Sequence, residues 1–299
     1  MGFRPSSTFK RALRLVWAVW LPVVAHAQPE LSWFVTDWPP LFIFAKGQPP
    51  SQPADLGEGQ VDRVMAELIA RLPAYQHRFE SLNSRRLWRA MAEGRALCSA
   101  AALKTSERSA LAYFTPHLRV APPVLVVRAK GAERYVGADG RASLRALLER
   151  PDLHGRLEVD RSYGPQLDPL LAGSRTLPRD STSRIGQMAE LVAAGRVDYT
   201  LDFAHTIEYL RRQGRLREPL AALPLQEAGD WSLGYVACPR TPWGLAAITA
   251  IDQAIRQAAA SRSYREAYIR WLPEPLRSEQ QPLFEAFYDA RAQGGPQIE

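Results

Sequence analysis

Apolar residues recur along this chain at two alternating spacings, one typical of amphipathic helices and one typical of strands. Strands are expected at 33–35, 76–82 and 95–103. Between them, the segments 59–72 and 84–94 carry apolar side chains at helical spacing. This order of strand, helix, strand, helix and strand predicts a parallel sheet with helices on both faces.

The alternation pauses once and then begins again. A hydroxyl-capped helix is expected to start at Thr105 and Ser106, and an extended apolar segment at 119–129 follows it. The next elements expected are helix 143–150, strand 156–160, turn 161–165, helix 165–173, strand 174–178, helix 181–195, strand 196–201 and helix 204–214. A strand at 231–238 and a helix, break and helix over 242–272 come last.

Two such runs predict two α/β units joined by two crossings of the chain. The chain is expected to leave the first unit near the prolines at 122–123 and to return to it near 229–233. The first unit then comprises 28–122 together with 231–299, which ends in a C-terminal helical tail. The second unit comprises 123–230.

The N-terminal segment has the layout of a secretory signal peptide. Basic residues precede an apolar run at 15–25, and the triplet Ala25, His26 and Ala27 follows. We expect a signal peptide over 1–27, with cleavage before Gln28. A membrane anchor is the alternative, but the apolar run is well short of the roughly 20 residues that span a bilayer. The mature product is therefore expected to be soluble and outside the cytoplasm.

Composition is that of an ordinary globular protein, with 46% hydrophobic and 23% charged residues. The formal net charge of the whole chain is +7, and removing the four basic residues of the signal leaves +3. Basic residues are scattered, and no stripe of aromatic and basic side chains accompanies them. This pattern argues against a nucleic-acid partner.

Four segments resemble a known family when they are taken in order. They are "TDWPPLFIF", "LWRAMAEGRALCSAAALKTSERSALAYFTPHL", "MAELVAAGRVDYTLD" and "YREAYIRWL". In this order and spacing the chain resembles extracellular solute-binding proteins of family 3, from Leu31 to about Leu272. The resemblance implies the two-lobed, type II periplasmic binding protein fold. It is an α/β fold of mainly parallel sheets with helices on both faces and a ligand cleft between the lobes.

The resemblance also implies which residues line the cleft. Ligands bind beyond the carboxyl ends of strands in open α/β sheets, so Trp38 and Asp37, just after the first strand, are expected there. The alternative is that Trp38 only covers the lobe surface. Arg108 matches the family's arginine that pairs bidentately with a ligand carboxylate. The alternative for Arg108 is a surface ion pair with Glu107 or Asp62, which would contribute little.

The chain departs from the family pattern at several of the expected ligand positions. Leu103 stands where the family often has a serine or threonine. Asp202 falls one residue before the family's acidic position, so its side chain could face the sheet instead of the cleft. Ser162 and Tyr163 lie in the turn that could hold a carboxylate, with a plain helix cap as the alternative.

Two cysteines, Cys98 and Cys238, lie in strand-like runs. The default interpretation is a pair of buried free thiols. A disulfide is the alternative if the two strands are neighbours, and the resemblance implies that both strands belong to lobe 1.

The predicted function is capture of a small polar solute, an amino acid or related carboxylate, by lobe closure. The resemblance implies a monomeric periplasmic protein that serves an ABC-type uptake system through an inner-membrane permease, with no cofactor or metal and no catalysis. A lyase or hydrolase on the same fold is one alternative, with Asp37, Asp160 or Asp202 as acid or base. A sensor that acts in trans is another.

Overall fold

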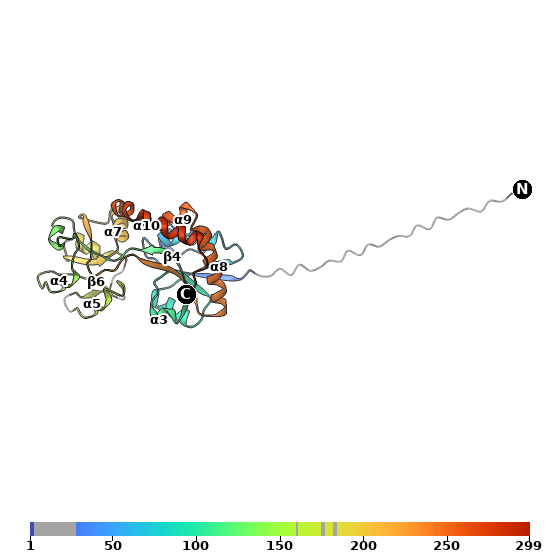
Figure 1. The fold of residues 1–299 in the computed structure, drawn as a ribbon, viewed down its shortest axis with the longest axis horizontal. Coiled ribbons are helices and arrows are strands. Elements are labelled where there is room, and N and C mark those ends of the chain that lie inside the picture. Colours follow the sequence, from blue (N-terminus) through green and yellow to red (C-terminus); the bar gives the residue numbers. More distant parts are fainter. Residues whose placement is uncertain (3–27, 160, 175–176, 182–183) are drawn as a thin grey trace.

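The computed structural model of this 299-residue chain describes residues 1–2, 28–159, 161–174, 177–181 and 184–299. The predicted signal peptide therefore lies, apart from its first two residues, outside the described residues. Residues 28 onward form two lobes side by side, as Figure 1 shows. Lobe 1 is the half that contains the C-terminus and the helices α8, α9 and α10, and lobe 2 contains α4 to α7.

Lobe 1 is built on a five-stranded sheet in the order β2-β1-β3-β10-β4. β1 runs parallel to β2 and β3, whereas β10 runs antiparallel to β3 and β4. The strands are β1 (Glu30–Val35), β2 (Gln76–Ser81), β3 (Leu97–Ala102), β4 (Ala112–Val120) and β10 (Ser232–Pro239).

Helix α1 packs into the lobe 1 core through the apolar face that the sequence predicted. Val61, Met65 and Leu68 of α1 are at most 2% exposed, as expected for one stripe of an amphipathic helix. The helices are α1 (Gln60–Ile69), α2 (Ser84–Ala92), α3 (Ser106–Ser109), α8 (Pro242–Ala258), α9 (Arg262–Ile269) and α10 (Glu274–Gln293). Two short 3₁₀ segments, η1 (Ala45–Gly47) and η2 (Pro53–Asp55), lie in the loop before α1.

A disulfide joins Cys98 of β3 to Cys238 of β10, with the two Cα atoms 4.4 Å apart. These strands are neighbours in the sheet, which is the condition that the sequence interpretation set for a bridge. The default expectation of two free thiols is therefore wrong.

Lobe 2 holds two smaller sheets. In the first, β5 (Val124–Arg128) runs antiparallel to both β8 (Tyr199–Asp202) and β9 (Leu220–Pro224). In the second, β6 (Leu157–Glu158) and β7 (Arg179–Asp180) are parallel. The helical segments are η3 (Ala132–Tyr135), α4 (Leu144–Leu148), α5 (Asp168–Ala172), α6 (Gln187–Ala193) and α7 (Ala204–Arg212).

The chain crosses between the lobes twice, and the two crossings lie side by side. On the lobe 1 side Val120 of β4 pairs with Ser232 of β10, and on the lobe 2 side Val124 of β5 pairs with Pro224 of β9. The lobes are thus joined by two adjacent segments, an arrangement suited to hinge motion.

Several elements differ from the sequence prediction. The helix expected from Thr105 lasts only one turn, and the following residues form β4. β9 is an additional strand in a stretch to which no element was assigned. The strand expected at 174–178 falls partly on 175–176, outside the described residues, and β7 begins at Arg179. The two-lobed α/β fold is confirmed, but the strand directions are mixed because β10 and β5 oppose their neighbours.

Neither a helix able to cross a bilayer nor a group of three or more metal-ligating side chains occurs among the described residues.

Candidate functional site

The loop after β1 carries Trp38 and is fixed to the start of α1. The buried Asp62 carboxylate accepts hydrogen bonds from the backbone amides of Ile43, at 2.8 Å, and Gly59, at 3.1 Å. Burial raises the pKa of Asp62 to about 6, although these two amides oppose the effect. The Trp38 carbonyl accepts a further hydrogen bond from the Phe42 amide at 3.0 Å. This bonding holds the half-buried Trp38 at the carboxyl end of β1.

Trp38 faces a buried arginine of lobe 2. The Cζ atom of Arg161 lies 5.8 Å from the centre of the Trp38 ring, within the range of cation–π attraction. The rings of Tyr163 and Phe203 lie 5.6 Å and 5.4 Å from the same Cζ atom. Trp38 therefore lies against the other lobe and does not simply cover the surface of its own.

Two carboxylates hold the Arg161 guanidinium from within lobe 2. Its Nη1 donates to Glu158 Oε2 at 2.5 Å, and its Nη2 donates to Asp202 Oδ1 at 2.7 Å. Asp202 Oδ1 also accepts the Phe203 amide at 2.7 Å. We call this group the Arg161 cluster, and its members are Trp38, Glu158, Arg161, Tyr163, Asp202 and Phe203.

The three charged side chains of the Arg161 cluster are almost completely buried, and the carboxylates keep the guanidinium charged. Glu158, Arg161 and Asp202 are 5%, 7% and 1% exposed. Burial acts to lower the pKa of Arg161, but the Asp202 and Glu158 carboxylates outweigh it, so the pKa is raised and the guanidinium stays charged. Burial also raises the pKa of Tyr163, so its phenol stays protonated.

A second set of contacts between the lobes is made by side chains of α7 and by Phe203, which precedes it. The His205 ring stacks on Phe203 at 5.4 Å and lies 5.8 Å from the Tyr268 ring of lobe 1. Tyr209 meets Trp271 of lobe 1 at 5.5 Å. Burial lowers the pKa of His205 to about 4, so its imidazole is neutral at pH 7. We call these side chains the interlobe seam.

The turn at 161–165 is occupied by a carboxylate of its own lobe. Asp168 accepts hydrogen bonds from the Ser162 hydroxyl at 2.5 Å and from the Tyr163 amide at 2.7 Å. The Ser162 hydroxyl in turn accepts the Gly164 amide at 3.2 Å. The turn therefore binds a carboxylate of the protein itself and caps no helix, because the N-cap of α5 is Leu167 and makes no side-chain cap bond. Ser162 is exposed, and Tyr163 is buried in the Arg161 cluster.

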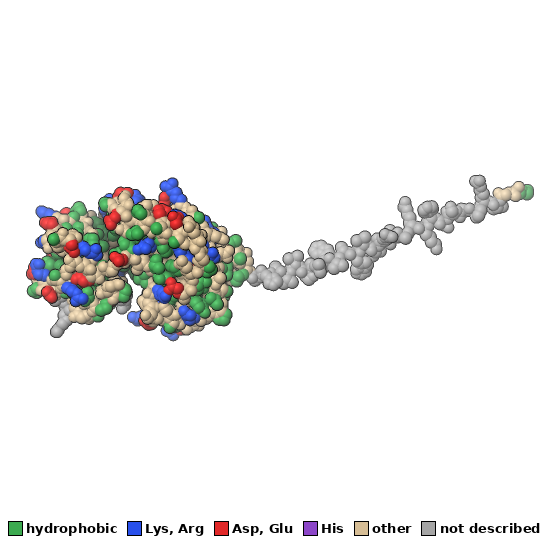
Figure 2. All heavy atoms as spheres, viewed as in Figure 1, with side chains coloured by type: hydrophobic (Ala, Val, Ile, Leu, Met, Phe, Trp, Pro, Cys, Tyr) green, Lys and Arg blue, Asp and Glu red, His purple; other side chains and the backbone are tan. Residues whose placement is uncertain are grey.

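Arg108 lies in lobe 1 on the short helix α3. Its guanidinium stacks on the Trp88 ring at 4.4 Å, and its Nη1 donates to the Leu103 carbonyl at 2.9 Å. These contacts replace the surface ion pair that was the alternative interpretation. Leu103 itself is 37% exposed. Figure 1 places α3 across from β6 and α5 of lobe 2, and Figure 2 shows a notch between the lobes on this side.

The structure thus brings together only part of the predicted site. Trp38, Tyr163 and Asp202 meet in the Arg161 cluster, whereas Arg108, Leu103 and Ser162 lie apart from it. The exposed Asp37 is close enough to the interlobe seam to help raise the pKa of Tyr209, which burial raises in the first place. Asp160 lies outside the described residues.

Sequence reasoning missed the residues at the centre of the cluster, Glu158, Arg161 and Phe203. Glu158 and Arg161 are only three positions apart, but Asp202 is 41 positions further along the chain. A contact between residues so far apart leaves no local signal in the sequence, because only the fold of lobe 2 brings the residues together.

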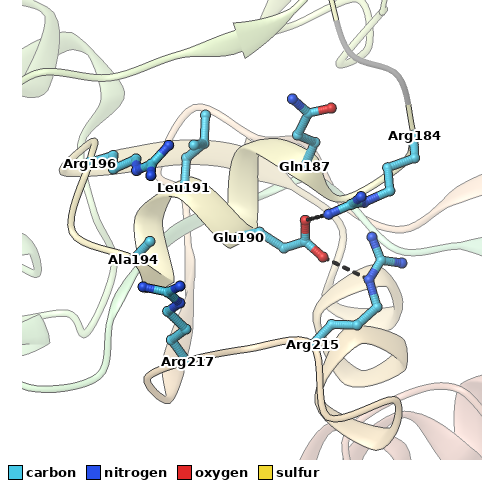
Figure 3. A pocket seen from close by; sticks show the side chains of 8 residues that line it. All are labelled: Arg184, Gln187, Glu190, Leu191, Ala194, Arg196, Arg215 and Arg217. Atoms are coloured by element: carbon cyan, nitrogen blue, oxygen red, sulfur yellow. Dashed lines mark hydrogen bonds and ion pairs between the residues drawn. The ribbon is translucent and has the colours of Figure 1, made fainter.

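Two further hollows lie elsewhere. One, of about 670 Å³, lies beside α6 of lobe 2, where Glu190 pairs with Arg184 at 2.6 Å and with Arg215 at 2.7 Å (Figure 3). Another, of about 1450 Å³, lies where the connecting segments meet α7 and α10. Neither is lined by Trp38 or Arg161.

Comparison with known proteins yields structural likeness only. No model of a protein family and no curated protein matches the chain. A probable amino-acid ABC transporter extracellular-binding protein of Bacillus subtilis superposes with a TM-score of 0.59 at 16% identity, covering 83% of this chain and 98% of that one. A structure from work on glutathione import through a cystine ABC importer of Streptococcus mutans gives 0.61 at 13% identity, covering 84% and 100%.

A histidine kinase sensor domain similar to periplasmic binding proteins also superposes, with a TM-score of 0.57 at 16% identity, covering 82% of this chain and 96% of that one. Similarity at these identities establishes architecture and leaves the ligand open. The chain has the two-lobed fold of the periplasmic binding proteins, as the resemblance of its sequence implied.

Proposed function

We propose that this chain is an exported binding protein that captures a small polar solute, an amino acid or related carboxylate, between its two lobes. Residues 28–122 and 231–299 would form lobe 1, and residues 123–230 would form lobe 2. The observation that carries the proposal is the meeting of Trp38 with Arg161 across the lobe boundary, at the carboxyl end of β1. The fold likeness, which spans 98% of the Bacillus subtilis binding protein, supports it.

Capture follows from contacts made with both lobes at once. A solute in the notch would touch α3 of lobe 1 and the turn at 161–165 of lobe 2, so it would bind the closed form more tightly than the open one. The two adjacent crossings are the elements that would bend. Arg108 would exchange its bond to the Leu103 carbonyl for a bond to a solute carboxylate, which is a stronger, charge-assisted acceptor.

We propose that the closed form delivers its solute to an ABC-type permease of the inner membrane, without turnover. This use is favoured because the Bacillus subtilis neighbour is a probable amino-acid ABC transporter extracellular-binding protein. A trans-acting sensor is the second candidate, because a histidine kinase sensor domain shares the fold to a similar degree. The transport and sensor functions are separated by comparing uptake of the identified solute in cells with and without the gene. Loss of the gene should lower the uptake rate only if the protein is a transport component.

A thermal-shift screen of the mature protein against amino acids, dicarboxylates and amines tests solute capture. For any carboxylate that raises the melting temperature, we expect Arg108→Ala to weaken binding by about 10- to 100-fold, the loss of charge-assisted hydrogen bonds. Arg86→Ala is the matched control, because Arg86 is exposed on α2 of the same lobe. Unchanged affinity in Arg108→Ala would remove Arg108 from the site, and a hit that is converted to product would replace binding by catalysis.

A further inference from the structure

The Arg161 cluster has the composition of a site for a guanidinium ion. Three aromatic rings lie within 6 Å of Cζ, and two carboxylates accept from the two terminal nitrogens. Rings favour a cation over their faces, and carboxylates match the planar fork of a guanidinium. The parts come from both lobes, since Trp38 follows β1 and the others belong to lobe 2.

We propose that the cleft contains a guanidinium-binding site that the chain fills with its own Arg161, so that a tethered group holds the lobes together where a free cation would otherwise bind. The inference rests on the proposed function in one respect only, the ability of the lobes to open and close. The ligand class of the vacated site is a monosubstituted guanidinium, because one nitrogen must carry the chain while the other two face Glu158 and Asp202.

Comparison with another buried arginine shows what is particular to Arg161. Arg291 is 1% exposed and donates to Asp252 at 2.7 Å and to Thr115 at 3.3 Å. Both acceptors belong to lobe 1, and no ring contact with its guanidinium occurs among the described residues. Arg291 therefore forms an ordinary ion pair within the core of lobe 1, whereas Arg161 contacts the carboxylates of lobe 2 and the Trp38 indole of lobe 1.

The charge balance indicates which variant should expose the site. Two carboxylates surround one guanidinium, so the Glu158, Arg161 and Asp202 set carries a net charge of −1. Removing Arg161 alone would leave two buried negative charges together, which risks unfolding. In the double variant Arg161→Ala with Glu158→Gln, the single charge of Asp202 keeps the net charge at −1 and leaves room for a free guanidinium.

The test uses this double variant of the mature protein, with the radius of gyration from X-ray scattering and the melting temperature as readouts. We expect a larger radius of gyration than in the native protein. Millimolar methylguanidinium should restore the native radius and raise the melting temperature by about 3 °C at ten times its dissociation constant. Methylammonium, with the same charge and no planar fork, should do neither, and the native protein should not respond to methylguanidinium.

Two controls keep the test decisive. Trp38→Leu leaves the ion pairs of Arg161 intact and should also open the lobes, so it serves if the double variant does not fold. Arg291→Ala should lower the melting temperature without a change in lobe separation or a response specific to the cleft. The proposal is overturned if Trp38→Leu keeps the native radius, or if a folded double variant responds equally to both cations or to neither. A failed solute screen alone would reject the proposed function and leave these results unaffected.

Discussion

The disulfide between Cys98 and Cys238 should be a major source of stability for lobe 1. It closes a loop of 140 residues, and the chain-entropy relation gives about 5 kcal/mol for a loop of that length. Measured values usually fall somewhat below this relation, so we expect the variant Cys98→Ala with Cys238→Ala to lose about 3 to 5 kcal/mol. For a chain of this size, such a loss corresponds to a fall of roughly 6 to 15 °C in melting temperature.

Urea denaturation of the oxidised native protein and of the double alanine variant measures this difference. The two alanines remove two buried sulfur atoms, so the single variants Cys98→Ala and Cys238→Ala provide the control for lost packing. Each single variant already lacks the bridge, and the double variant should therefore add little to either. A loss below about 1 kcal/mol would refute the reasoning, because the closed loop would then contribute almost nothing to the free energy of unfolding.

Two further predictions concern buried histidines and a buried ion pair. Burial lowers the pKa of His117 to about 3 and of His205 to about 4. Their neutral forms therefore stabilise the fold above pH 6.5, and stability should fall by about 2 kcal/mol per histidine between pH 6.5 and pH 5. The raised pKa of Asp62, about 6, has the opposite effect, because protonation of this buried carboxyl favours the folded state as the pH falls. Its contribution is smaller than that of the two histidines together. The urea midpoints of unfolding at pH 7 and pH 5 measure the net change in stability from all three groups. In His205→Phe the loss of stability at pH 5 should be smaller. A higher midpoint at pH 5 than at pH 7 would contradict the prediction. Asp252→Ala should cost about 3 to 5 kcal/mol by leaving Arg291 buried with no carboxylate, whereas an unchanged midpoint would show that water compensates it.

The periodic parts of the fold were predictable because each apolar stripe is a local property. Val61, Met65 and Leu68 recur at helical spacing and are all buried in α1. Strand direction is not local, and the antiparallel insertion of β10 between β3 and β4 leaves no mark on its apolar pattern. β9 was missed for another reason, since its residues are half-buried or exposed and show no clear alternation.

The candidate site was predictable only where the backbone dictates position. Trp38 follows β1 directly, and the carboxyl end of that strand faces the other lobe. Asp202 was a candidate from the sequence, but its partner could not be predicted. The ion pair with Arg161 depends on how the segment before β6 lies beside β8, where Gly155 bridges to Tyr199. The ring contact of Arg108 with Trp88 could not be predicted, because the two residues are 20 positions apart in the sequence.

The position of β10 has a consequence for the order in which the molecule is assembled. Lobe 2 is a continuous piece of chain, but the sheet of lobe 1 stays divided between β3 and β4 until residues 232–239 are available to pair with both strands. Cys98 therefore cannot form its disulfide until Cys238, 140 residues further along the chain, is in place. We expect the oxidation of this cysteine pair to mark the moment at which β10 enters the sheet and lobe 1 becomes complete.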